Sequence, residues 1–322
     1  MRARESFAGL LLSRRACVRL LAGGALCRAY ADSSQDGPLT WAAEPAPDTG
    51  QERRYRADAQ VVLLSLPLVR WPNVGGGSTV WRETSAARGV VRFLEFTGFS
   101  RPERAAGLNR LGFLREMTRM APDGGSESVY FGLMTTSPEE TAEQARKALH
   151  PTAKDAAYEA IDGHMAAGVV DTVVGHFTAP AHWGVANRQE LIERAQASLT
   201  VAAKRPFAGD ARGAALRPFL ETLAAALRQK MPAEARFAYA GRPYHLWLEQ
   251  TPDPKASVRY RQRGLIVKDA AVMQVTGRLR REAGGKESTF RLWVEHGAAR
   301  PLPLRIEYRA KAYLRLIFEA EG

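Results

Sequence analysis

The sequence predicts an α+β protein that is predominantly antiparallel β, with a large curved sheet or barrel-like meander and a helical middle segment. In residues 301–319, apolar side chains occupy the even positions from Leu304 to Phe318, and charged side chains occupy most odd positions. Such alternation predicts strand with one buried and one wet face. Residues 244–295 contain further alternating runs separated by turn residues, which is typical of an antiparallel meander. Helix start signals are concentrated in the middle of the chain.

The first 31 residues have the features of an export signal. Arg14 and Arg15 follow a serine and precede a short apolar run, an arrangement that resembles the twin-arginine signal. Ala29 and Ala31 then flank one residue, which gives a small-x-small cleavage site. The alternative is an apolar N-terminal helix that stays attached. We expect export, with Arg14 and Arg15 as the export motif and Ala29 and Ala31 as the cleavage site.

Cleavage after Ala31 would remove six arginines, one glutamate and both cysteines from a chain of formal net charge +12. The mature chain would therefore be five charges less positive, yet still basic enough to favour anionic partners or surfaces. Without a thiol, it would have no disulfide and no cysteine chemistry. No other segment approaches the roughly 20 apolar residues of a membrane span. We expect a periplasmic or secreted protein that is not integral to the membrane once the signal is cleaved.

The rest of the chain divides into a lead-in and one domain. Residues 32–55 are rich in Pro, Asp, Ser and Gly, a composition that predicts a flexible lead-in. Residues 56–322 are expected to form a single β-rich domain with a helical insertion at about 137–231. No internal repeat of fixed period is present in the sequence.

Strand patterns lie on both sides of the predicted helices. The apolar run Val61–Leu64 predicts a strand that is covered on both faces, and Pro67 predicts an end, a bulge or an edge after it. The other strand patterns are at 79–83, 89–97, 128–134, 169–177, 244–249, 258–263, 265–281, 290–295 and the closing stretch.

Helix starts are predicted from capping residues and leucine spacing. Ser137 and Asn187 each open a capping box, and Pro218 precedes a stripe of leucines. Ser100 opens a further capping box, which predicts either a helix or a short helix that passes into a strand at 113–120. The other predicted helices span 137–149, about 187–199 and 218–231.

The closing residues 301–308 (PLPLRIEY) and 312–318 (AYLRLIF) resemble the last strands of a family of exported, β-rich bacterial proteins of unknown function. The resemblance implies an open or closed antiparallel barrel-like sheet in the cell envelope, loosely similar to lipid and lipoprotein carriers. Its motifs are turns and strand faces, so it implies no catalytic residues. Further segments that are similar to this family are 74–77, 107–112, 130–134 and 290–295.

Three histidines are the candidate metal ligands. His164, His176 and His182 lie close together in the sequence, and zinc sites use such sets. Their spacing matches no recognised zinc pattern, and a histidine that ends an apolar strand is more often a satisfied core residue. No G-x-S-x-G motif or other strand–turn–helix context exposes a serine nucleophile. We therefore expect no catalytic residues, no metal and no cofactor.

A set of basic residues is predicted to project from the polar sides of neighbouring strands. These residues either form a solvated face that pairs with Glu295, Glu307 and Glu319, or attract anionic lipid head groups or polysaccharide. Export makes a nucleic-acid partner unexpected. The set comprises Arg259, Arg261, Arg263, Arg278, Arg280, Arg281, Arg291, Arg305, Arg309, Lys311 and Arg315.

Three functions remain open on the sequence. The first is a non-enzymatic exported protein that binds or carries an apolar or amphiphilic envelope component, such as a lipid, on a concave face lined by even-numbered residues of the last strands. The second is an exported hydrolase or metal-dependent enzyme that uses residues 162–182. The third is a structural envelope protein without a small ligand. The sequence does not determine the oligomeric state.

Overall fold

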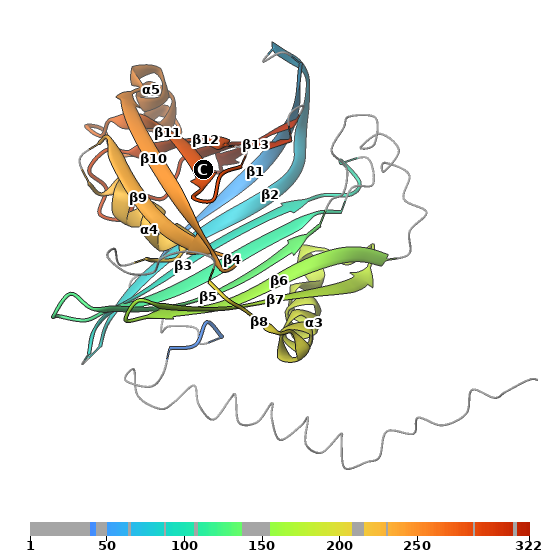
Figure 1. The fold of residues 1–322 in the computed structure, drawn as a ribbon. Helices are drawn as coiled ribbons and strands as arrows, with labels where there is room; N and C mark the ends of the chain where they lie inside the picture. Colours follow the sequence, from blue (N-terminus) through green and yellow to red (C-terminus); the bar gives the residue numbers. More distant parts are fainter. Residues whose placement is uncertain are drawn as a thin grey trace, which may run out of the picture. The chain divides into compact units, whose positions relative to one another are not determined.

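A single antiparallel sheet of fourteen strands organises the chain (Figure 1), in the order β8-β7-β6-β5-β4-β3-β2-β1-β14-β13-β12-β11-β10-β9. Every neighbour in this order is also a neighbour in sequence, except that β1 pairs with β14. The sheet is curved and open, and the predicted fold class is confirmed. The computed structural model describes residues 39–42, 50–63, 66–86, 88–105, 109–136, 155–207, 216–229, 231–285, 287–311 and 314–322.

The strands are β1 Gly50–Leu63, β2 Leu66–Ala86, β3 Gly89–Ser100, β4 Leu111–Met120, β5 Ser126–Thr135, β6 Asp155–Ala166, β7 Val169–Pro180, β8 Lys204–Arg205, β9 Ala233–Tyr239, β10 Arg242–Pro252, β11 Val272–Arg281, β12 Ser288–Glu295, β13 Arg305–Lys311 and β14 Leu314–Ala320. The described helices are the 3-10 turn η2 Val185–Asn187 and the α-helices α3 Arg188–Val201, α4 Phe219–Leu227 and α5 Pro254–Gln262. The export motif Arg14 and Arg15, the cleavage residues Ala29 and Ala31, and the helix predicted at 137–149 lie outside the described residues.

Helix α4 covers the concave face of the sheet, which we call the inner face. Leu220 and Ala224 of this helix pack with Trp81 of β2 and Leu94 of β3. Other α4 side chains, including Phe219, Leu223 and Leu227, pack against the inner residues of β9 to β12. Because α4 contacts strands from both halves of the sheet, apolar packing rather than an open cavity occupies the inner face at this level.

The opposite face, here the outer face, carries the other two helices. Helix α3 buries Leu191, Ile192, Ala195 and Leu199 against β6 and β7. Helix α5 buries Tyr260 against Trp293 of β12 and Leu304. Trp293 and its neighbour Leu292 point to opposite faces of β12, and Leu292 packs on the α4 side. Strand β12 is therefore covered on both faces.

The strand predicted at 258–263 is wrong, because residues 254–262 form helix α5. The side chain of Asp253 accepts a hydrogen bond from the Ala256 N–H at 2.8 Å, and Pro254 occupies the first turn. This N-terminal cap starts a helix, and the spacing of the buried residues Ala256 and Tyr260 is helical. The short apolar–basic alternation that begins at Val258 arises by chance, because Arg259 and Arg261 lie on the exposed surface of this helix. The strand predicted at 265–281 begins only at Val272.

Other boundaries also differ from the predicted ones. Residues 101–105 form a turn, so the helix start predicted at Ser100 is wrong over these residues, whereas strand β4 confirms the strand predicted at 113–120. The middle segment contains β6, β7 and β8 as well as α3 and α4, and α4 ends at Leu227 rather than at Met231. Strand β1 begins at Gly50, inside the stretch predicted as a lead-in, because its first residues pair with β2.

Close side-chain approach requires glycine at one inner position of β6. A Cβ atom at Gly163 would lie 2.1 Å from the ring of Tyr130 on β5. Tyr130 is buried, and its hydroxyl lies 2.9 Å from the Oγ1 of Thr172 on β7, so this ring is held from three strands. We predict that Gly163→Ala lowers the free energy of unfolding by about 1–3 kcal/mol, because the ring must shift within packed surroundings.

Chemical denaturation of Gly163→Ala beside Gly112→Ala measures this effect. Gly112 lies in β4, and its nearest neighbour to an added Cβ is the Gly98 carbonyl oxygen at 4.0 Å. The Gly112 variant should therefore retain wild-type stability. Equal stabilities of the two variants would contradict the packing described for Tyr130.

Candidate functional site

The ends of two hairpins meet at one end of the sheet. Hairpins β1–β2 and β13–β14 lie side by side because β1 pairs with β14, which separates β1 from β13. The register places Trp71, Ala59, Leu316 and Tyr308 opposite one another across β2, β1, β14 and β13. Directly paired residues of antiparallel strands share a face, so these four side chains form a row.

A second apolar row lies beyond the first, toward the hairpin ends. Val69, Val61 and Leu314 pair across β2, β1 and β14. Both rows belong to the inner face, because Leu316 has the same parity as Phe318, which packs with Tyr55 and Ala57. We call the partly exposed members of the two rows the apolar hairpin face: Val61, Val69, Trp71, Tyr308, Leu314 and Leu316.

Exposure distinguishes the apolar hairpin face from the rest of the inner face. Trp71 is 49% exposed, Val69 48% and Tyr308 40%, whereas Phe318, further along β14, is 7% exposed. The apolar clusters formed by α4 contain none of the apolar hairpin face. Contiguous apolar groups that remain open to solvent on a folded protein are typical of binding surfaces.

The outer face of the same strands is basic. Arg70, Gln60, Arg315 and Arg309 pair across β2, β1, β14 and β13. Along the strands, this polar row lies between the two apolar rows. Its side chains point to the opposite face of the sheet. We call Arg70, Arg309 and Arg315 the arginine row.

Arg70 is held by a buried carboxylate. Asp58 is 1% exposed, and its Oδ2 accepts from Nε of Arg70 at 3.0 Å, while its Oδ1 accepts from the Asn73 N–H at 2.7 Å. Asn73 has a positive φ of 54°, and the register of β1 against β2 shifts beside it, between Ala57 and Ala59. Asp58 therefore stabilises the irregularity that sets the pairing of Trp71 with Ala59.

Much of the predicted basic face is an ion-pair network beneath α5. Arg305 donates to Glu307 and to Glu319, and Arg291 donates to Glu307 at 2.6 Å. Arg263 of the α5 end donates to Glu319 at 2.9 Å. Pairing of these arginines with Glu307 and Glu319 is thus confirmed. The wet odd-numbered face predicted for the closing strands is wrong here, because α5 covers it and Glu307 is only 6% exposed.

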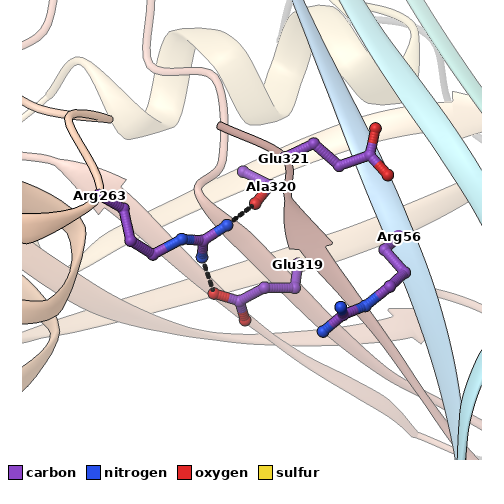
Figure 2. Close-up of a pocket in the computed structure, with 5 residues that line it drawn as sticks. All are labelled: Arg56, Arg263, Glu319, Ala320 and Glu321. Atoms are coloured by element: carbon purple, nitrogen blue, oxygen red, sulfur yellow. Dashed lines mark hydrogen bonds and ion pairs between the residues drawn. The ribbon is translucent and has the colours of Figure 1, made fainter.

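A pocket of about 290 Å³ lies beside this network (Figure 2), lined by Arg56, Arg263, Glu319, Ala320 and Glu321. Figure 2 shows Arg263 reaching Glu319 and the Ala320 carbonyl oxygen, while Arg56 and Glu321 approach from β1 and the chain end. Within the pocket, Arg263 and Glu319 form an ion pair that ties the end of α5 to β14, while Arg56 lies 3.7 Å from an oxygen of Asp58 outside it.

A second polar cluster fixes α4 to the inner face. Glu116 of β4 accepts the backbone N–H groups of Leu220 and Glu221, each at 2.8 Å, so it caps the start of the helix. Arg92 of β3 donates to Glu221 and to Glu83, each at 2.6 Å. Burial raises the pKa of Glu116 to about 8, against the opposing effect of the two N–H donors.

The three candidate metal ligands do not form a shared site. His164 lies on β6, with Nε2 3.3 Å from an oxygen of Glu127. His176 on β7 pairs with Glu159, which has the opposite parity to His164, so the two imidazoles point to opposite faces. His182 lies in the exposed turn after β7. Over the described parts of the chain, no group of three or more His, Cys, Asp or Glu side chains is placed to hold a metal ion.

Sequence reasoning missed Trp71 and the openness of the hairpin end. The run from Val61 was expected to be covered on both faces, yet Val61 is half-buried and Val69 half-exposed. The bulge predicted near Pro67 is confirmed, since the register shifts between Val61 and Val62 where Pro67 pairs. The signal available in the sequence was an apolar run that ends abruptly in Arg70 and Trp71.

No protein-family model and no curated protein match the chain. The chain is similar to the crystal structure of a β-barrel-like protein of the domain of unknown function DUF1849 from Brucella abortus. The structural match covers 84% of this chain and 95% of the Brucella chain. The sequence identity is 11% and the TM-score 0.36. Among the described residues, no helix has the length and apolar character needed to cross a membrane.

Glu116 makes stability depend on pH. Because its pKa rises from 4.5 in the unfolded chain to about 8 in the folded one, the folded state holds an extra proton between these values. This contribution to stability is complete below pH 4.5 and is lost as pH rises toward 8, by at most about 1.4 kcal/mol per pH unit. We predict that Glu116→Gln removes this slope.

Urea denaturation of wild type and Glu116→Gln at several pH values between 5 and 9 gives the free energy of unfolding of each protein. The difference between the two proteins at each pH isolates Glu116, because the titration of all other groups is common to both. Glu249→Gln is the control, because Glu249 is an exposed residue of β10. A difference between wild type and Glu116→Gln that stays constant with pH would exclude the protonated state of Glu116.

Proposed function

We propose that the protein is an exported envelope protein that binds an apolar or amphiphilic ligand without catalysing a reaction. The observation that carries this proposal is the apolar hairpin face, with Trp71, Val69 and Tyr308 each 40% or more exposed. Location in the periplasm or outside the cell is supported by the twin-arginine-like residues Arg14 and Arg15 and by the site at Ala29 and Ala31.

The filled inner face limits where such a ligand binds. Since α4 occupies the curve of the sheet between β3 and β10, the ligand site is at the hairpin end rather than along the whole concave face. Tyr308, Leu314 and Leu316 are even-numbered residues of the closing strands, the set expected to face a ligand. Aromatic side chains with a polar edge, such as Trp71 and Tyr308, suit a ligand with an apolar chain and a polar head.

Neither alternative function gains such support. An enzyme that uses residues 162–182 would need converging side chains, and His164 and His176 lie on opposite faces. A structural envelope protein would need no open apolar rows, and it makes a different prediction in the following experiment.

Native mass spectrometry of protein purified from its own envelope tests the proposal. We predict that the wild type retains a small amphiphile and that Trp71→Ala combined with Tyr308→Ala loses it. Each aromatic truncation removes a contact surface worth about 1.5–3 kcal/mol when buried, so affinity should fall at least tenfold. Both side chains are partly exposed, so the variant should remain folded.

Trp247→Ala is the matched control. Trp247 stacks on His245 on the outer face of β10, away from the hairpin end, and its loss should leave the retained mass unchanged. Absence of any retained amphiphile in the wild type would favour the structural role. Equal retention by all three proteins would place the ligand elsewhere.

A further inference from the structure

A short segment of the lead-in lies against the outer face of β3 to β6. Leu39 and Trp41 pack into apolar clusters of the sheet, whereas Thr40 and Ala42 are exposed. Within the described part of the chain, no backbone–backbone hydrogen bond joins residues 39–42 to a strand. We call residues 39–42 the strap. Because side-chain contacts rather than strand pairing hold the strap, its departure would break no pair of the sheet.

Trp41 contacts three neighbouring residues of one cross-strand row. The register pairs Arg115 of β4 with Phe131 of β5, and Phe131 with Asp162 of β6, so these side chains share the outer face. The Trp41 ring stacks on the Phe131 ring, with the centroids 4.1 Å apart and the planes inclined by 17°. Nη1 of Arg115 donates to the Trp41 carbonyl oxygen at 3.2 Å. The indole N–H, which is the one donor of the Trp41 side chain, hydrogen-bonds to the Asp162 carboxylate.

Leu39 lies over the next row along the same strands. Phe93, Met117 and Val129 pair in this order across β3, β4 and β5. They form the buried cluster against which this leucine packs. The two rows together accept a leucine, a tryptophan two residues later and the carbonyl group of that tryptophan. We call them the strap slot, which consists of Phe93, Arg115, Met117, Val129, Phe131 and Asp162.

Contacts within the domain orient the polar groups of the strap slot. Glu95 of β3 accepts from Nε and Nη2 of Arg115 at 2.9 and 2.8 Å. The other carboxylate oxygen of Glu95 accepts from Arg188 of α3 at 3.3 Å. Arg115 is thereby fixed with Nη1 toward the strap, and Asp162 supplies an acceptor on the other side of Phe131. An apolar floor with a few placed polar groups is typical of a recognition site.

We propose that the strap slot binds flexible peptide segments of partner proteins that carry leucine and, two residues later, tryptophan, and that the strap occupies the slot in cis until a partner segment replaces it. The segment seated in the slot selects this class of occupant. Departure of the strap alone would expose the apolar floor to water, so replacement by a similar segment is favoured over an empty slot. A tethered segment competes at an effective concentration in the millimolar range, so the strap admits only partners that bind well.

Peptide binding at the strap slot goes beyond the proposed ligand binding and does not depend on it. The strap slot is on the outer face of β3 to β6, whereas the apolar hairpin face is on the inner face of β1, β2, β13 and β14. A variant with a weakened strap should therefore retain its amphiphile in native mass spectrometry, so the two properties can fail separately.

Fluorescence polarisation with a labelled peptide of residues 36–45 (DGPLTWAAEP) tests the proposal on the full chain that remains after cleavage at Ala31. Leu39→Ala with Trp41→Ala in the protein removes the side chains that occupy the slot. We predict that this double variant binds the peptide about tenfold more tightly than the wild type, whose strap competes in cis. A peptide that carries Trp41→Ala should bind neither protein.

A second pair of variants locates the bound peptide. Asp162→Ala, added to the double variant, should weaken peptide binding about tenfold, because a hydrogen bond to a charged acceptor is lost. Asp171→Ala is the matched control, since Asp171 is an exposed residue of β7 that lies 3.8 Å from Lys204. This control should leave peptide binding unchanged, and equal effects of the two substitutions would contradict binding in the strap slot.

Circular dichroism and urea unfolding establish that each variant is folded before its binding is compared. Leu39→Ala alone leaves Trp41 stacked on Phe131 and provides a milder test, with a peptide affinity between those of wild type and double variant. Absence of peptide binding by either folded variant would overturn the proposal and leave the strap a structural role only. A wild-type dimer that Trp41→Ala dissociates would also overturn it, because the slot would then hold the strap of a second copy.

Discussion

The pairing of the first strand with the last determines how this molecule is built. Strand β1 and strand β14 are joined from Tyr55–Ala320 to Val61–Leu314, across almost the whole described chain. Every other strand pair is a local hairpin or meander step, so this one contact converts two meanders into a single sheet. Closing so long a loop costs conformational entropy that many buried contacts must offset. It also sets the two apolar hairpins beside each other, which neither meander alone would do.

Helix α4 covers one part of the inner face and leaves the hairpin end of that face open. Helix α4 joins the halves of the sheet through apolar contacts, and Glu116 fixes its start through two backbone N–H groups. Arg92 links the same helix to Glu83 of β2. These contacts fill the curve of the sheet, and the open apolar surface is left at the hairpin end, where α4 does not reach. A rigid scaffold that presents a small open surface is a usual arrangement for binding proteins.

Local patterns predicted the strands well, and long-range contacts account for the misses. Alternation correctly placed Ile306, Tyr308, Leu316 and Phe318 on one face of the sheet, because a strand has a strict period of two. The expectation that this whole face is buried was wrong at Tyr308, which is 40% exposed. The prediction that the odd-numbered face is exposed to solvent was wrong at Glu307, which lies beneath α5. The position of α5 depends on tertiary packing that the strand's own sequence does not encode. Neither the pairing of β1 with β14 nor the row that contains Trp71 could be predicted, since both depend on register between segments far apart in the sequence.

The account depends most directly on a ligand lying against Trp71. A brominated fatty acid quenches tryptophan fluorescence only at short range, and the six tryptophans of the chain can be separated by substitution. Titration of wild type and Trp71→Phe with this probe, at equal occupancy, measures which tryptophan is quenched. We expect quenching in the wild type and its loss in Trp71→Phe, with Phe preserving the apolar surface. Undiminished quenching in Trp71→Phe would contradict binding at the apolar hairpin face.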